Sequence, residues 1–178
     1  MRWDAIIKRL DKDAPLIGAE VGVWEGLNSL KLLEAMPNIV MHYMIDPYEP
    51  YEDRFYGGKR TPFGGLVASQ ANLNGAKEKA RKTTEPYKDR RVLVYKSSIV
   101  ASLEIADKSL DYVFIDAAHD YESARVDILT WLEKIKPGGL ISGHNYKDGT
   151  YKGVDMAVEE IFGQVEADSN VTWFKRVE

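Results

Sequence analysis

The order of apolar and polar segments predicts an α/β fold. Short apolar stretches of strand length alternate with segments of helical periodicity from residue 16 onward. Glycine or polar residues follow each apolar stretch, as they do at the carboxyl ends of parallel strands. The 178 residues, 44% of them apolar, suffice for one substantial core and fall short of two ordinary domains. We therefore predict one Rossmann-like domain over residues 1–178, with a mostly parallel sheet, helices on both faces and an antiparallel C-terminal strand.

Each element in the first part of the chain has a local signal. Apolar residues at helical spacing predict an amphipathic helix within residues 1–10. Residues 16–23 form a short apolar run with glycine near its end, which is typical of a buried parallel strand. Asn28 or Ser29 is expected to cap a helix that ends at Met36, before Pro37, and a second strand over 40–45 leads to Asp46.

The second part of the chain repeats this rhythm. Helices are predicted where apolar residues share one helical face, and strands where short apolar runs are bounded by turn residues. The expected helices cover 69–83, 124–135 and 154–161, with a short one from Ser97 or Ser98 toward Ile105. The expected strands cover 91–95, 112–115, 140–143 and 171–177, and the last is expected to pair antiparallel with a short strand near Val165.

Residues 47–68 interrupt the rhythm. Within 47–65, three prolines, four glycines and five aromatic residues exclude a regular helix or a central strand. We expect a surface lid or insertion whose aromatic rings close over a ligand and exclude water. Packing of the same rings against the core is the alternative. The aromatic residues are Tyr48, Tyr51, Phe55, Tyr56 and Phe63.

Composition narrows the function classes. A net charge of −4 gives no general attraction to nucleic acid or anionic membranes, and acidic residues interrupt the basic stretch 77–96. The absence of cysteine excludes disulfides, thiolate metal sites and a cysteine nucleophile. Charged residues within 1–10 argue against a signal peptide, and no stretch is long and apolar enough to span a membrane. We expect a cytoplasmic protein that acts on a small molecule, without nucleic-acid or membrane partners.

The turn after the first strand is the first candidate binding feature. Gly22 and Gly26 let its backbone approach a ligand closely. Trp24 stands where a dinucleotide-binding turn needs its second glycine, and Glu20 and Glu25 would repel phosphates. A cationic adenosyl ligand fits better, and S-adenosylmethionine carries both a sulfonium and an ammonium group.

Residues after the second and third strands extend this candidate site. Asp46 is placed to accept hydrogen bonds from two ribose hydroxyls. Ser97 or Ser98 could hydrogen-bond an adenine edge, or cap the following helix instead. For Glu20 and Asp46, a capped loop or a surface ion pair is the structural alternative.

The fourth and fifth strands are followed by groups suited to proton transfer. Asp116 and His119 share one turn after the fourth strand, and His144 and Asn145 follow the fifth. Because parallel strands end at the same edge of a sheet, we expect these residues to lie near the glycine turn. An imidazole side chain can exchange a proton near neutral pH, which makes His119 the candidate general base. The structural alternatives are a helix cap for Asp116, a backbone-carbonyl partner for His119 and a satisfied polar role for His144.

Three segments resemble a known enzyme family: EVGVWEG, MIDPY and FIDAAHDYESARVDILTWLEKIKPGGLISGHNY. From Ile17 onward the chain resembles the class I S-adenosylmethionine-dependent methyltransferases. The longest segment is similar to the macrocin-type sugar O-methyltransferases and, more distantly, to the catechol-type O-methyltransferases. The resemblance implies methyl transfer, with Glu20, Gly22, Gly26 and Asp46 holding the cofactor.

The same resemblance implies a metal site. In these families the residue that matches Asp116 binds a metal, and the residue that matches His119 is the base. Two adjacent residues after the fifth strand, acidic and then acidic or amide, complete the metal site. Asn145 matches the amide form, whereas His144 replaces a carboxylate. A site of Asp116, His144 and Asn145 would hold magnesium weakly and would suit manganese or another imidazole-binding metal better, so the metal is left open.

The sequence thus predicts S-adenosylmethionine-dependent O-methylation of a small molecule, such as a sugar or a sugar-bearing metabolite. A non-catalytic cofactor-binding module or partner subunit is the alternative that the altered metal position motivates. A nicotinamide-dependent reductase or epimerase would share the sheet, but the sequence lacks the glycine pattern and the Tyr-x-x-x-Lys pair of that class. No recognisable motif identifies the methyl acceptor. The sequence also leaves open whether the protein is a monomer or a homo-oligomer.

Overall fold

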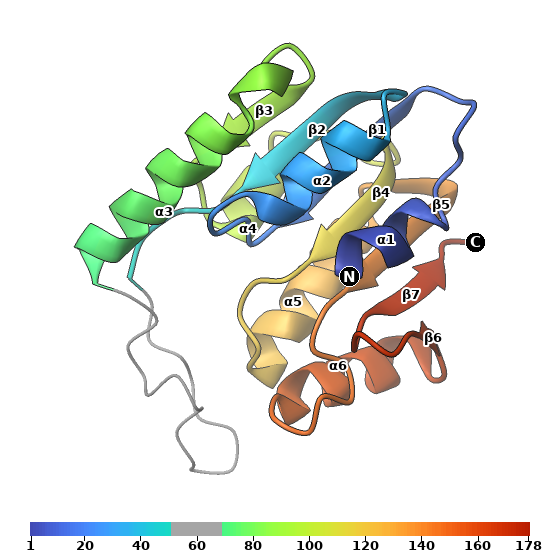
Figure 1. Cartoon of the computed structure of the whole chain (residues 1–178). Coiled ribbons are helices and arrows are strands. Elements are labelled where there is room, and N and C mark those ends of the chain that lie inside the picture. The colour runs from blue at the N-terminus through green and yellow to red at the C-terminus, as the bar shows by residue number, and fades with distance from the viewer. Residues whose placement is uncertain (51–68) are drawn as a thin grey trace.

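A computed structural model describes residues 1–50 and 69–178 of the chain (Figure 1). Within them a seven-stranded sheet has the order β3-β2-β1-β4-β5-β7-β6. Strands β1 to β5 are parallel, and β7 runs antiparallel to both β5 and β6. The predicted fold class is confirmed. The strands are β1 (Leu16–Val21), β2 (Ile39–Ile45), β3 (Arg91–Val94), β4 (Leu110–Ile115), β5 (Ile135–Gly143), β6 (Glu166–Ala167) and β7 (Trp173–Arg176).

Helices cover both faces of the sheet, because each has one apolar face that must be buried. On one face, Ile6 and Leu32 pack with Phe114 of the sheet, so α1 and α2 lie there. On the other face, Ile128 and Val158 pack in a second cluster, which places α5 and α6 there. The helices are α1 (Arg2–Ile7), α2 (Leu27–Ala35), α3 (Gln70–Thr83), α4 (Ser98–Ser102), α5 (Tyr121–Leu132), α6 (Lys152–Phe162) and the short 3₁₀ helix η1 (Glu85–Tyr87).

The predicted cap of α2 is wrong. The helix begins at Leu27, and the residue before it, Gly26, has the left-handed φ of 79°. Asn28 and Ser29 lie inside the helix and are buried, with their side chains directed at the carboxylate of Glu20. Asn28 and Ser29, which were expected to cap the helix, therefore donate to the buried carboxylate of Glu20 instead. An unpaired buried charge would cost more free energy than an uncapped helix end.

The boundary between α5 and β5 also differs from the prediction. Ile135 was expected to end a helical face, but it pairs with Leu110 as the first residue of β5. The register between β4 and β5 then shifts before Tyr112 pairs with Leu140. This shift accommodates Pro137 and the glycines after it inside the strand, where a proline cannot donate to the ladder.

The carboxyl ends of the five parallel strands lie side by side, and backbone hydrogen bonds hold them in register. The N–H groups of Gly22, Asp46, Asp116 and His144 donate to the last carbonyls of β2, β3, β1 and β4, at 2.9, 3.1, 2.8 and 3.0 Å respectively. We call this edge of the sheet the rim. It brings together four positions that are far apart in the sequence.

Most of the predicted lid, residues 47–68, lies outside the described residues. Tyr48 is described and is buried in a small cluster with Val23 and Leu73. Its hydroxyl donates to the carbonyl of Trp24 at 2.8 Å. This ring therefore packs under the glycine turn and against α3, which was the alternative to closing over a ligand.

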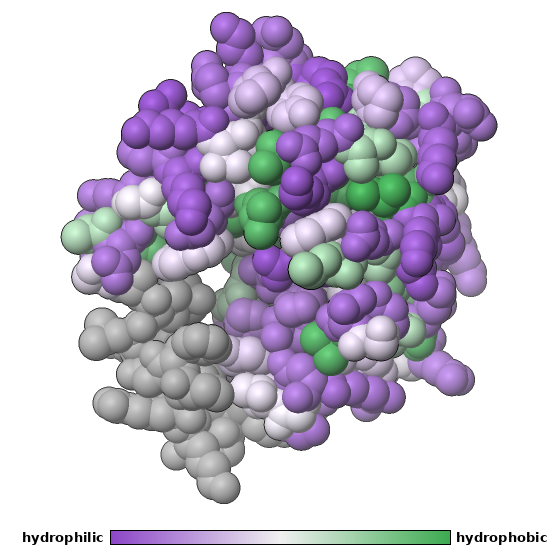
Figure 2. All heavy atoms as spheres, viewed as in Figure 1, coloured by the Kyte–Doolittle hydropathy of each residue, from purple (hydrophilic) through white to green (hydrophobic). Residues whose placement is uncertain are grey.

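The outer surface of α3 is hydrophilic, and hydrophobic residues form only small separate groups in this view (Figure 2). The basic residues here are balanced locally, since Lys79 pairs with Glu25 and Arg81 with Glu78. The helix starts as predicted, because the Ser69 hydroxyl accepts from a backbone N–H of its first turn. No helix among residues 1–50 and 69–178 is long and apolar enough to cross a membrane.

Candidate active site

The glycine turn after β1 is shaped by close contacts with the chain itself. Gly22 has φ of 88°, and a Cβ there would collide with the backbone carbonyl of Asp116. Gly26 has φ of 79°, and a Cβ there would lie 2.9 Å from the Cα of Ala80. Both conformations favour glycine, which explains the pattern read from the sequence. Trp24 shares the left-handed region with φ of 51° although it has a side chain, and 45% of it is exposed.

Asp46 holds this turn in place. One carboxylate oxygen accepts from the backbone N–H groups of Val23 and Trp24 at 3.1 and 3.0 Å, and the other accepts from Tyr48 at 2.9 Å. Burial raises the pKa of Asp46 above its usual value, although the three amides act in the opposite direction. A ribose bound here would share this carboxylate with the backbone of the turn, since a carboxylate offers about four acceptor positions.

Glu20 lies inside the fold, with 1% of its surface exposed. Its carboxylate accepts from Asn28 Nδ2 at 3.2 Å and from the Ser29 hydroxyl. The same hydroxyl lies 2.9 Å from His42 Nε2, and the other ring nitrogen of His42 lies 2.8 Å from the Tyr112 hydroxyl. Glu20 thus anchors β1 to α2 and β2. We call Glu20, the turn 22–26 and Asp46 the turn half of the rim.

His42 and Tyr112 were missed by the sequence reasoning. Both are fully buried residues with polar groups, His42 among the mostly apolar residues of β2 and Tyr112 among those of β4. That placement is the one signal that could have identified them, because buried polar groups need partners.

The two candidate serines after β3 occupy different environments. Ser97 is the N-cap residue of α4 and is exposed, but its side chain makes no capping hydrogen bond. The Ser98 hydroxyl accepts from Trp131 Nε1 at 2.8 Å and also contacts Asp127, so it faces α5. Of the two serines, Ser97 is the exposed one, so its side chain is the more accessible to a ligand.

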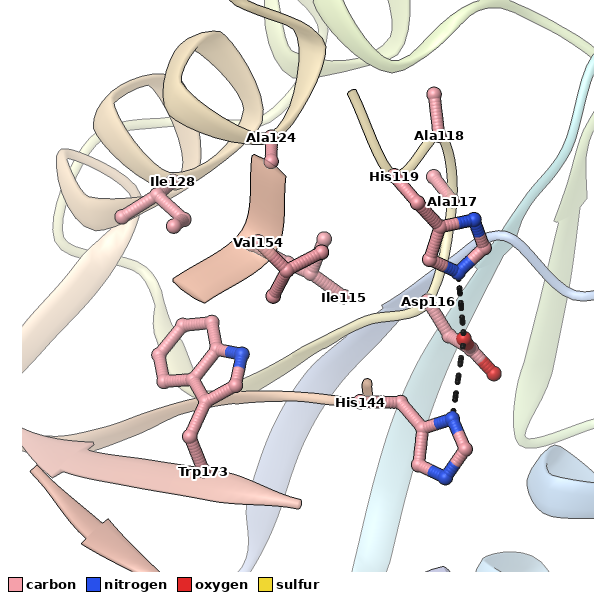
Figure 3. Close-up of a pocket in the computed structure, with 10 residues that line it drawn as sticks. All are labelled: Ile115, Asp116, Ala117, Ala118, His119, Ala124, Ile128, His144, Val154 and Trp173. Carbon is pink, nitrogen blue, oxygen red and sulfur yellow. Dashed lines mark ion pairs between the residues drawn. The ribbon is translucent and has the colours of Figure 1, made fainter. Parts of the chain in front are cut away.

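After β4 and β5, two imidazoles lie on either side of Asp116 (Figure 3). One carboxylate oxygen of Asp116 lies 3.7 Å from His119 Nε2 and 3.6 Å from His144 Nδ1. The His119 ring stacks on Tyr151 with 4.2 Å between centroids, which fixes its plane. The remaining nitrogen of each ring points away from the carboxylate (Figure 3). Apolar residues such as Trp173 line a cavity of about 20 Å³ beside this cluster, enough for one water molecule.

Arg2 completes the cluster from the N-terminal helix. Its guanidinium donates to the second carboxylate oxygen of Asp116. Burial would raise the pKa of Asp116, but the two imidazoles and Arg2 outweigh it and hold that pKa far below the usual 3.8. At His144 burial acts in the other direction and lowers the pKa of the imidazole. The Asp116 carboxylate more than compensates, so the pKa of His144 is raised above its usual 6.5. We call Arg2, Asp116, His119 and His144 the histidine half of the rim.

The residues expected to bind a metal contact one another instead. Asn145 Oδ1 lies 3.0 Å from His144 Nδ1, the nitrogen that also faces Asp116, and Asn145 Nδ2 donates to Asp148 at 2.8 Å. Among the residues described, no group of three or more His, Asp or Glu side chains is arranged to hold a metal ion. Asp116 Oδ1 and Asn145 Oδ1 both face His144 Nδ1, so the three candidate ligand atoms lie close together, and the charge of Arg2 at the other oxygen of Asp116 is what opposes a cation there.

Comparison with known proteins identifies the family. The profile of a family described as a methyltransferase domain matches residues 19–146, which is most of the chain and includes both halves of the rim except Arg2. The chain belongs to this methyltransferase family. A search of curated protein sequences found no significant match.

Solved structures support the same conclusion about the fold. The calicheamicin methyltransferase CalS11 superposes with a TM-score of 0.73 at 14% identity, over 98% of this chain and 77% of the other. The O-methyltransferase NovP gives 0.66 at 16% identity, over 98% and 78%. A putative methyltransferase from Streptococcus mutans in complex with SAH gives 0.60 at 14% identity, over 97% and 92%. The predicted membership of the class I S-adenosylmethionine-dependent methyltransferases is confirmed, and the protein is such an enzyme.

The turn half suits this cofactor chemically. Asp46 lies against the amides of the turn at the end of β2, so its carboxylate is within reach of a ligand placed along the turn. Glu25 and Asp116 are paired with Lys79 and Arg2, so Asp46, whose partners are all neutral amides, is the carboxylate left to attract a cationic ligand. The residues present therefore fit S-adenosylmethionine.

Proposed function

We propose that this methyltransferase methylates a hydroxyl group of a small molecule, such as a sugar or a sugar-bearing metabolite, with His119 as the general base. The observation that carries the proposal is the His119 ring, which is stacked on Tyr151 and directed at Asp116 on the same rim as the turn. The CalS11 and NovP structures, a calicheamicin methyltransferase and an O-methyltransferase by their names, support acceptors of this kind.

The orientation of His119 gives it a defined proton position. Its Nε2 faces a carboxylate that stays ionised, which favours the tautomer with the proton on Nε2. Nδ1 is then the basic nitrogen, and it takes the proton of the acceptor hydroxyl. Bound along the turn, S-adenosylmethionine would supply a methyl group on a cationic sulfur, whose departure with the electron pair of the S–C bond would balance formation of the C–O bond. Asp116 acts on the reaction by orienting His119.

The cofactor roles follow from the turn half. Gly22 and Gly26 shape the turn, and Asp46 accepts from ribose hydroxyls while it holds the turn. Ser97 remains the candidate for the adenine edge. Glu20 supports the turn through α2 and does not contact the cofactor, since its carboxylate is buried. The proposal needs no metal, because His119 supplies the base and Arg2 already pairs with Asp116.

Calorimetry with S-adenosylhomocysteine tests the cofactor site. We expect micromolar binding by the wild type, with or without Mg²⁺ or Mn²⁺, and at least ten-fold weaker binding by Asp46→Ala. Asp46→Asn is the matched control, because it keeps one acceptor oxygen and the size of the side chain. Unchanged affinity in Asp46→Ala would show that the cofactor binds elsewhere.

Transfer of a labelled methyl group to a panel of sugars, phenols and catechols tests the chemistry. We expect His119→Ala to lose at least 100-fold in rate at unchanged S-adenosylhomocysteine affinity, as general-base catalysis is worth that much. A rate insensitive to His119→Ala would favour the alternative, a cofactor-binding module or partner subunit without catalysis of its own. That alternative is motivated by the altered residue after β5, His144.

A further inference from the structure

One cationic side chain in the rim has no role in the reaction as proposed so far. Arg2 belongs to α1, yet it reaches the carboxylate of Asp116, which lies 114 positions later in the chain. The helix is fixed in place by Ala5 and Ile6, which are buried against the sheet face and α2. Figure 1 shows its N-terminus beside the end of β4. The packing of α1 therefore holds Arg2 at the rim.

The contacts of Asp116 divide between its two oxygens. One oxygen accepts from the Arg2 guanidinium, and the other faces His119 and His144. The Asp116 side chain is only 13% exposed, and the guanidinium of Arg2, whose side chain is 32% exposed, lies against its second oxygen. A divalent cation approaching Asp116 would meet a fixed positive charge, and the two would repel each other.

Only one guanidinium nitrogen of Arg2 is used in this contact. Its other nitrogens make no hydrogen bond to residues 1–50 or 69–178, and the side chain is partly exposed. A guanidinium has five N–H donors in one plane and stays charged at every working pH. Arg2 can therefore hold Asp116 and still present donors to an oxygen atom in the site, which is what a bound metal would do with its open coordination positions.

We propose that Arg2 takes the place of a divalent metal at Asp116, excluding metal ions from the rim and presenting a built-in cation to the acceptor oxygen. The inference rests on the proposed function for the role of the acceptor oxygen. Exclusion of metal rests only on the contacts of Arg2, Asp116 and His144. In this scheme Arg2 is a catalytic residue where it contacts the acceptor oxygen, and it also positions the carboxylate that orients His119.

Titration with Mn²⁺ alone, followed by the electron paramagnetic resonance signal of the free ion, tests the proposal. We expect no binding by the wild type below about 1 mM, which is the weak range of affinities. Arg2→Met keeps the length of the side chain and removes its charge, and it should bind Mn²⁺ at least ten-fold more tightly. Adding Asp116→Asn to Arg2→Met should abolish the gain, and Arg2→Lys should behave as the wild type.

Lys8→Met is the matched control, since it removes the same charge from the other end of α1, where the side chain is exposed. It should leave Mn²⁺ binding unchanged. Two results would overturn the proposal: Mn²⁺ binding by the wild type that Asp116→Asn abolishes, or an Arg2→Met variant that binds no more tightly than the wild type or Lys8→Met.

S-adenosylhomocysteine calorimetry on the same variants separates the two proposals. Unchanged affinity in Arg2→Met shows that the turn half is intact, so a change in Mn²⁺ binding reports on Asp116. A wild type that fails to bind S-adenosylhomocysteine would contradict the proposed cofactor site and leave the Mn²⁺ result standing on its own.

Discussion

In the turn half of the rim, the carboxylates of Glu20 and Asp46 accept hydrogen bonds from amides and a hydroxyl. In the histidine half, the carboxylate of Asp116 faces a guanidinium and two imidazoles. Neutral donors fix geometry and keep their protonation across the working pH range. Ionisable partners fix geometry too, but their charge changes with pH and with bound ions. The turn half is therefore built to hold a shape, and the histidine half to respond to protons and cations.

The difference appears in the pKa values. Burial raises the pKa of Asp46 despite its three amide partners, whereas His119, His144 and Arg2 lower the pKa of Asp116 against a similar effect of burial. Charged partners overcome desolvation and neutral ones do not, because the Coulomb attraction grows as water is excluded. Variants of two carboxylates, Glu20 and Asp127, and of one histidine, His144, can break or sharpen this comparison.

The largest expected effect is that of Glu20→Ala. The variant leaves the donors of Asn28 and Ser29 without their buried acceptor, and each unpaired buried donor costs about 1–3 kcal/mol, in addition to the cavity that the smaller side chain leaves. Urea denaturation of the wild type and Glu20→Ala measures the loss, with Glu20→Gln as the matched control that keeps one acceptor. A loss below about 1 kcal/mol would mean that the network does not stabilise the fold, contrary to the assignment of Glu20 as an anchor.

An intermediate effect is expected at Asp127, a buried carboxylate on α5 that contacts the Ser98 hydroxyl. Burial raises the pKa of Asp127 to about 6, although Ser98 acts in the opposite direction. A carboxyl group whose pKa is raised on folding binds its proton more tightly when folded, so stability is lost as pH rises from 3.8 to about 6. Asp127→Asn should therefore be more stable than the wild type by about 2 kcal/mol at pH 8 and nearly equal to it at pH 4.

Thermal unfolding of Asp127→Asn and the wild type at the two pH values measures this difference. Equal stabilities at pH 8 would show that the single hydroxyl of Ser98 balances the burial of Asp127. In that case neutral donors would suffice, and the contrast drawn with Asp116 would fail.

The smallest expected effect concerns His144. Its pKa is raised on folding, so its interaction with Asp116 stabilises the fold fully below pH 6.5, and the contribution is lost as pH rises through the folded-state pKa. His144→Gln should remove this loss. Between pH 6 and pH 9, the change in unfolding free energy of the wild type should differ from that of His144→Gln by less than about 1 kcal/mol. Glu20→Gln, in the turn half, should show the same slope of unfolding free energy against pH as the wild type. If His144→Gln kept the slope of the wild type, a group other than His144 would be responsible for the pH dependence of stability.

Much of the fold could be predicted from the sequence. The alternation of apolar runs and helical periodicity decides the order of strands and helices, and the antiparallel C-terminal pair was predicted as well. The boundaries that differ have tertiary causes. Ser29 points inward because Glu20 is buried next to it, and Ile135 joins β5 because Leu110 is there to pair with it.

The candidate site divides in the same way. The hydrogen bonds of Asp46 in the turn half are local, since Val23 and Trp24 lie 23 and 22 positions earlier. The glycine pattern reflects a backbone conformation that only a few residues tolerate. The histidine half was predicted as a group, since parallel strands end at one edge. Its internal contacts were not, and neither Arg2 nor the pairing of Asn145 with His144 has a sequence signal.

By itself, the sequence determined the sheet, the rim and the residue types on it, because backbone hydrogen bonding and hydrophobic periodicity act over short distances along the chain. Only the tertiary structure decided what each carboxylate faces. Glu20 turned inward to α2, and Asp116 met an arginine from the far end of the chain. Charge pairing depends on distance in space, and a pair 114 positions apart becomes close only when α1 packs across the folded sheet.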